Sequence, residues 1–80
     1  MKVVVVEDQD YGYLGYHHEA DISLKVFGCP TLAETWMERT FKTWKPLPKI
    51  AKEMNQAYSC EDKNRHIHTV IIYAKEVIES

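Results

Sequence analysis

The chain opens with the run Lys2-Val3-Val4-Val5-Val6-Glu7, in which four consecutive valines favour a buried β-strand. β-branched side chains pack well on a pleated surface, and a short continuous apolar run is typical of a strand inside a core. A second such run, Thr69-Val70-Ile71-Ile72-Tyr73, lies near the other end of the sequence. A strand that is apolar on both faces is usually central and covered on both sides, so we expect residues 66–77 to form the centre of a sheet.

The segment between the first valines and Gly28 is predicted to complete the first half of the sheet. Residues 7–12 combine acidic turn formers with Gly12, which predicts that the chain reverses there. Further on, Ile22, Leu24 and Val26 occupy alternate positions, the period of two expected of a half-buried strand. Residues 13–27 fit either one long bent strand or two strands of a meander.

Two helices are predicted after Pro30. Thr31 and Glu34 have the spacing of a capping box, and a helix over 31–44 would be anchored on the sheet by Trp36, Met37, Phe41 and Trp44. Prolines at 46 and 48 end that helix, because the residue before a proline disfavours helical geometry. A second helix over 48–58 would carry an apolar stripe of Ile50, Met54 and Tyr58, and residues 59–64 are polar and loop-like.

The predicted fold class is α+β. The order β-β(-β)-α-α-β describes a three- or four-stranded antiparallel sheet with two helices on one face. The chain has 80 residues, which is enough for one domain and too few for two, so residues 1–80 are expected to form a single compact domain.

Charge and apolar patterning bear on partners and location. Ten Lys and Arg residues are outnumbered by twelve Asp and Glu, whereas a general nucleic-acid binder usually carries a basic excess. The longest apolar run is far shorter than the roughly 20 residues of a membrane span, and the first residues lead directly into a strand pattern without a signal-peptide core. We therefore expect a cytoplasmic protein without a membrane partner, in which Cys29 and Cys60 are reduced thiols.

No residue pattern predicts a catalytic or metal site. His66 and His68 would share one face of a strand, and His17 and His18 form a second pair, but no spacing typical of a zinc site accompanies them. Cys29 precedes a predicted helix and could be an activated nucleophile, yet a structural thiol is the expected role. The acidic residues Glu7, Asp8 and Asp10 are interpreted as a solvated turn. The chain is accordingly predicted to be a non-enzyme that uses no cofactor and folds without metal.

Two groups of side chains are candidates for partner binding. Tyr11, Tyr13 and Tyr16 alternate with glycines and could form an exposed aromatic surface for a protein or for single-stranded nucleic acid. The alternative is that these tyrosines pack on the sheet. The second group is the basic cluster at the junction of the two predicted helices, which could steer an acidic partner or contact phosphates, and comprises Lys42, Lys45, Lys49 and Lys52.

Residues 3–44 resemble the HicB-type antitoxin fold. The resemblance lies in the first strand and its acidic end (Val3-Val4-Val5-Val6-Glu7-Asp8-Gln9-Asp10), the Gly/Tyr-rich return strand, a third strand, and a helix opened by Thr31-Leu32-Ala33-Glu34. It implies a ribonuclease-toxin partner and, in many members, a C-terminal DNA-binding segment. The family's aspartate-leucine-proline-glycine turn is missing, and no ribbon-helix-helix or helix-turn-helix follows.

These features predict a small protein-binding module that acts as an inhibitor or antitoxin-like regulator, for example a phage-encoded inhibitor of a host defence system. Its target would be a protein or nucleoprotein. The alternative is a nucleic-acid-binding protein that uses the tyrosine segment and the lysine cluster together.

Overall fold

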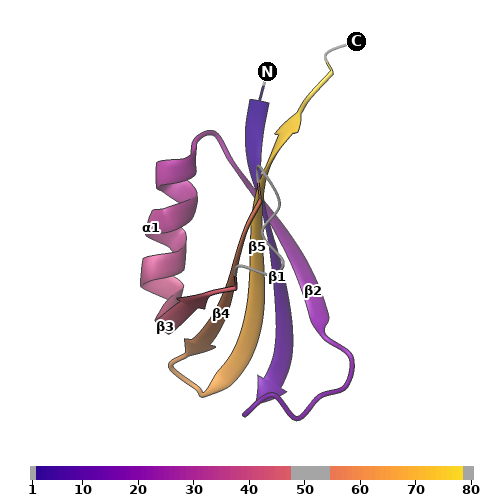
Figure 1. Cartoon of the computed structure of the whole chain (residues 1–80), viewed down its shortest axis with the longest axis vertical. Helices are drawn as coiled ribbons and strands as arrows, with labels where there is room; N and C mark the ends of the chain where they lie inside the picture. Colours follow the sequence, from indigo (N-terminus) through magenta and orange to yellow (C-terminus); the bar gives the residue numbers. More distant parts are fainter. Residues whose placement is uncertain (1, 48–54, 79–80) are drawn as a thin grey trace.

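The computed structural model describes residues 2–47 and 55–78. Within them the elements are β1 (Lys2–Tyr13), β2 (Asp21–Phe27), α1 (Pro30–Thr40), β3 (Phe41–Pro46), β4 (Asn55–Asp62) and β5 (His66–Glu76). All strand pairs are antiparallel and form one sheet in the order β2-β1-β5-β4-β3. Figure 1 shows α1 on one side of this sheet, and the described residues form no helix on the other side. We call these sides the helix-covered face and the open face.

The core lies between α1 and the helix-covered face. Side chains alternate between the two faces of a strand, so every second residue of β1 and β5 points towards the helix. The buried residues of this layer are Val4, Val6, Ala33, Met37, Phe41, Cys60, Val70 and Ile72. The prediction that residues 66–77 form a central strand is confirmed, because β5 lies between β1 and β4.

The helix α1 connects the two edges of the sheet. It leaves the end of β2 and leads directly into β3, the strand at the opposite edge. Ala33 and Met37 are buried one turn apart, which gives the helix a narrow apolar stripe facing the core. Eleven residues of helix extend only about 16 Å, so α1, the one helix of the described residues, is too short to span a membrane.

The predicted first helix is too long at its C-terminal end. The helix over 31–44 ends at Thr40, and both Phe41 and Trp44 belong to β3. Phe41 is only 3% exposed, whereas Trp44 is 40% exposed and does not anchor the helix. The β-branched and aromatic residues at 40–44 favour extended structure once they can pair with β4. The predicted capping box is also wrong, because the N-cap residue is Cys29 and makes no side-chain hydrogen bond.

The predicted α+β class with two helices is wrong: over residues 2–47 and 55–78 the protein is mostly β, with a five-stranded antiparallel sheet and a single short helix. Of the predicted second helix, residues 48–54 lie outside the described residues, but Ala57 and Tyr58 belong to β4. The predicted loop at 59–64 is also largely strand, and the chain turns only after Asp62. Tyr58 and Cys60 explain the difference: both contact the core, and residues two apart share a face in a strand but not in a helix.

The first half of the sheet also differs from its predicted form. β1 does not turn at 7–12 but continues to Tyr13, and the link to β2 includes Leu14 and Gly15, which both have positive φ. β2 is a separate strand, but it is not half-buried, because Ile22, Leu24 and Val26 are 62%, 62% and 64% exposed. These three residues point to the open face, where no described element packs over them.

Candidate functional site

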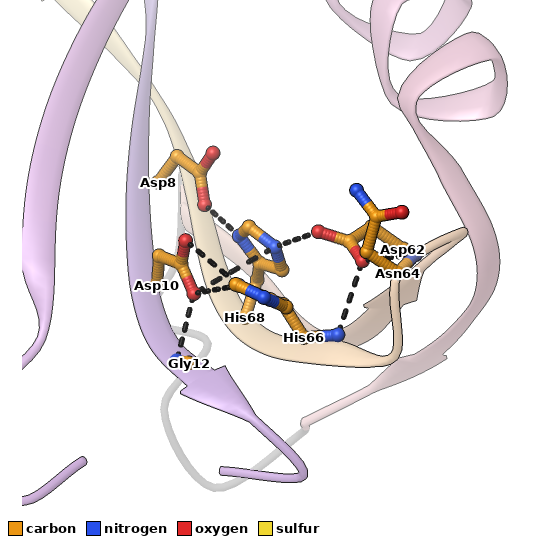
Figure 2. Close-up of polar contacts among 7 residues, drawn as sticks. All are labelled: Asp8, Asp10, Gly12, Asp62, Asn64, His66 and His68. Carbon is orange, nitrogen blue, oxygen red and sulfur yellow. Dashed lines mark hydrogen bonds and ion pairs between the residues drawn. The ribbon is translucent and has the colours of Figure 1, made fainter.

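A cluster of acidic and histidine side chains lies on the helix-covered face, at the end of the sheet away from the termini (Figures 1 and 2). We call it the Asp–His cluster, and it consists of Asp8, Asp10, Asp62, His66 and His68. Asp8 and Asp10 continue the inward-facing series of Val4 and Val6 along β1. On the neighbouring β5, His66 and His68 occupy the same face, and His68 is the cross-strand partner of Asp10. Asp62 reaches the cluster from the end of β4.

His68 is held between two carboxylates. Its Nδ1 lies 2.7 Å from Oδ1 of Asp8, and its Nε2 lies 2.8 Å from Oδ2 of Asp62 (Figure 2). The residue is 6% exposed, and its ring also contacts the ring of Phe41 at a centroid distance of 4.9 Å. Ionised carboxylates only accept hydrogen bonds, so both ring nitrogens must donate, and the imidazole is a cation.

The electrostatics agree with this protonation state. Burial alone would lower the pKa of His68, but the hydrogen bonds to Asp62 and Asp8 and the negative charges of Asp8 and Asp10 raise it above its usual value. For Asp62, burial opposes ionisation. Hydrogen bonds from His68 and from the backbone N–H groups of His66 and Asn64 outweigh it, together with the positive charge of His68, and lower the pKa. Both shifts favour the charged forms, so His68 and Asp62 are an ion pair at mildly acidic pH.

His66 is the more accessible histidine of the cluster. Its Nδ1 lies 3.4 Å from Oδ1 of Asp10, and its side chain is 38% exposed. Its backbone N–H donates to Asp62 and helps to close the turn between β4 and β5. Its Nε2 makes no hydrogen bond with the described residues.

The chemistry available to this cluster is limited. Both nitrogens of His68 are occupied, so the ring offers no lone pair to a metal or to a substrate proton. The nearby thiol of Cys60 is buried, and burial together with the charge of Asp8 raises its pKa to about 12, far from the thiolate that a nucleophile requires. Within residues 2–47 and 55–78, no group of three or more His, Cys, Asp or Glu side chains is arranged so that it could hold a metal ion. We interpret the cluster as a structural ion pair network that ties β1, β4 and β5 together.

The three tyrosines predicted to bind a partner do not share one environment. Tyr11 is half-buried in β1, where its hydroxyl donates to Oε1 of Gln9. Tyr13 ends β1 and is 51% exposed, and Tyr16 follows in the connecting loop and is 74% exposed. The structure thus brings Tyr13 and Tyr16 to the surface at the same end of the sheet as the Asp–His cluster.

The predicted lysine cluster is only partly described. Lys42 and Lys45 are exposed on β3, and Lys49 and Lys52 lie outside the described residues. β5 and β4 separate β3 from β1, so about three strand spacings, on the order of 14 Å, lie between these lysines and the tyrosine-bearing strand. The two groups therefore do not form one continuous surface.

A different surface, which was not predicted, lies on the open face near the chain termini. A groove of about 510 Å³ crosses β2, β1 and β5 and is lined by Val3, Val5, Leu24, Val26, Tyr73, Lys75, Glu76, Val77 and Ile78. We call it the apolar groove. Contiguous exposed apolar surface of this kind is typical of an interaction site.

Sequence patterns pointed to parts of both sites. The spacing of His66 and His68 predicts that they share one face of a strand, but the polar sequence around their aspartate partners favours a turn. The alternation of Ile22, Leu24 and Val26 indicated a strand face, and only the absence of a second covering layer reveals it as surface.

Comparison with protein-family models, with curated proteins and with solved structures finds no match. The resemblance of residues 3–44 to HicB-type antitoxins therefore stays a prediction, and a function has to be argued from the geometry.

Proposed function

We propose that this protein is a non-enzymatic binding module that inhibits or regulates a partner protein by occupying its surface through the apolar groove. The observation that carries the proposal is the exposure of Leu24 and Val26, two large aliphatic side chains that remain 62% and 64% exposed beside the groove. Fully burying one such side chain contributes about 1.5–3 kcal/mol, so a partner that covers both gains substantial affinity.

The composition of the groove supports a protein partner. Its lining is mostly valine, leucine, isoleucine and tyrosine, with Lys75 and Glu76 of opposite charge beside it. An apolar centre with a few charged groups beside it is the usual arrangement of a protein–protein interface. A phosphate backbone, in contrast, is held by clustered positive charge.

The nucleic-acid alternative is less well supported. It requires the tyrosines and lysines to act together, but β4 and β5 separate them. Tyr13 and Tyr16 lie at the same end of the sheet as the three carboxylates of Asp8, Asp10 and Asp62, and not beside the lysines of β3. The exposure of Tyr13 and Tyr16 nevertheless makes them a second candidate contact for a protein partner.

Affinity capture from the native host, with the wild-type protein and four variants as baits, tests the proposal. The groove variant combines Leu24→Lys and Val26→Lys, and its control is Leu32→Lys, which changes an aliphatic residue of α1 that is 53% exposed. A tyrosine variant replaces Tyr13 and Tyr16 by alanine, and a lysine variant replaces Lys42 and Lys45 by glutamine. We expect a specific protein to be retained by wild type and by Leu32→Lys, and its recovery to fall at least about tenfold with the groove variant.

All four variants change exposed residues, and circular dichroism verifies that each is folded. Equal recovery by the groove variant and by Leu32→Lys would refute the groove as the binding surface. A loss confined to the lysine variant, with recovery that falls steeply as salt rises, would identify a nucleic-acid or acidic target instead.

A further inference from the structure

The outer edge of β2 is unpaired within the described residues. β2 is the terminal strand of the sheet and pairs only with β1. The alternate N–H and C=O groups on its other side therefore point away from the sheet and can accept another strand.

The two edge strands of the sheet differ in their protection against such pairing. β3, at the opposite edge, contains Pro46 and an irregularity in register between Phe41 and Thr43, two features that block or distort strand addition. β2 has neither: its seven residues contain no proline, and their register with β1 is unbroken. Of the features that protect an edge strand from pairing, β2 has only two charged side chains, Asp21 and Lys25.

We propose that β2 pairs antiparallel with β2 of a second copy of this chain, around a two-fold axis at Ser23. The sequence of β2 is self-complementary in this register. Asp21 lies opposite Lys25 of the second copy, and the two-fold axis repeats this ion pair on the other side of the centre. On the open face, Ile22 lies opposite Leu24 of the second copy, again twice. Opposite charges and aliphatic pairs directly across two strands are the contacts that stabilise sheets.

The charges select this register over its neighbour. A two-fold axis at Leu24 would place Asp21 opposite Phe27 and Lys25 opposite Ser23, which pairs neither charge. Lys25 is also held near the strand by its contact with the ring of Trp36, 5.7 Å from the ring centroid. This contact keeps Lys25 on the helix-covered face, the face on which Asp21 of the second copy lies in the register centred on Ser23.

The resulting dimer has one continuous ten-stranded sheet, made from the five strands of each copy. Antiparallel pairing keeps paired residues on the same face, so both helices lie on one side and both open faces on the other. The two apolar grooves then flank the new seam. This inference goes beyond the proposed function: the seam shares Leu24 with the groove, but the pairing is made by the edge of β2 and requires no other protein.

Sedimentation equilibrium of the purified full chain tests the pairing, with four proteins that differ only at two exposed positions. Wild type is expected to show twice the monomer mass at concentrations on the order of 100 µM. Asp21→Lys and Lys25→Asp each place like charges opposite one another twice, and each is expected to raise the dimer Kd about tenfold. The double variant D21K/K25D exchanges the two charges and is expected to restore dimerisation.

Cysteine cross-linking locates the axis. In a Cys29→Ser background, Ser23→Cys is expected to form an intermolecular disulfide on mild oxidation, and Thr43→Cys, on the other edge strand, is expected to remain monomeric. A wild-type monomer at all these concentrations would overturn the inference, as would a double variant no better than the single ones or a cross-link at 43 instead of 23. These outcomes do not depend on whether the groove captures a partner protein, so either proposal can be refuted without refuting the other.

Discussion

His68→Gln is expected to lower the free energy of unfolding by about 3 kcal/mol at mildly acidic pH, because removing one member of a buried ion pair leaves the other without compensation. A glutamine amide can donate to only one of the two carboxylates that His68 bridges, Asp8 and Asp62. His66→Gln is the matched control, since His66 is two residues away on the same face and is much more exposed. Its effect is expected to stay within about 0.5 kcal/mol.

The effect of His68→Gln is expected to depend on pH, and the sign follows from the pKa shifts. The pKa of His68 is raised, so its contribution is fully present below its unfolded pKa of about 6.5 and is lost as pH rises through the folded value. The pKa of Asp62 is lowered, so its contribution is present above about 3.9 and is lost as pH falls. The difference between wild type and variant should therefore be largest between about pH 4 and 6.5.

Urea unfolding of both proteins at about pH 5.5 and about pH 9 measures this dependence. Wild type should lose stability over this interval through His68, and His68→Gln should lack that loss. An equal loss in wild type and variant would show that His68 is not a cation in the folded protein.

Phe41→Ala is expected to cost about 3–5 kcal/mol, the range for truncating a large buried aromatic. The ring of Phe41 packs edge-on against Trp36 at 5.5 Å and contacts His68 at 4.9 Å, so it joins the helix to the Asp–His cluster. In a domain of this size the loss is a large fraction of the total stability.

Trp44→Ala is the control for this prediction, because Trp44 lies three residues further along the same strand and is far more exposed than Phe41. Its cost should be within about 1 kcal/mol. Urea unfolding followed by circular dichroism compares the two variants. Similar costs for both would mean that residues 41–44 continue the helix, as their spacing had predicted.

The strands could be predicted where the local sequence pattern and the burial of the side chains favour the same structure. The valines of β1 and the apolar centre of β5 were identified because β-branched runs have few alternatives. The end of α1 could not be predicted, because the spacings of Trp36, Phe41 and Trp44 fit a helical stripe as well as a helix followed by a strand. Only the pairing of β3 with β4 decides between them.

The Asp–His cluster could not be predicted from the sequence, for a different reason. Asp8 and His68 are separated by 60 positions, and their contact depends on the pairing of the first strand with the last. From sequence alone, an aspartate favours a turn. Its place in a strand can be predicted only when the buried cationic partner is known. The exposure of the open face could not be predicted either. Alternating apolar residues indicate one face of a strand, but they do not tell whether another layer covers that face.

Photo-crosslinking from β2 tests most directly the claim that the open face binds the partner. A photoreactive residue replaces either Val26, on the open face beside the groove, or Lys25, its neighbour on the helix-covered face. The two positions are adjacent in the same strand and differ only in the face they present. In extract of the native host, we predict a cross-link to another protein from position 26 and none to that protein from position 25. A cross-link to it from position 25 alone, or to nucleic acid from either position, would contradict the account.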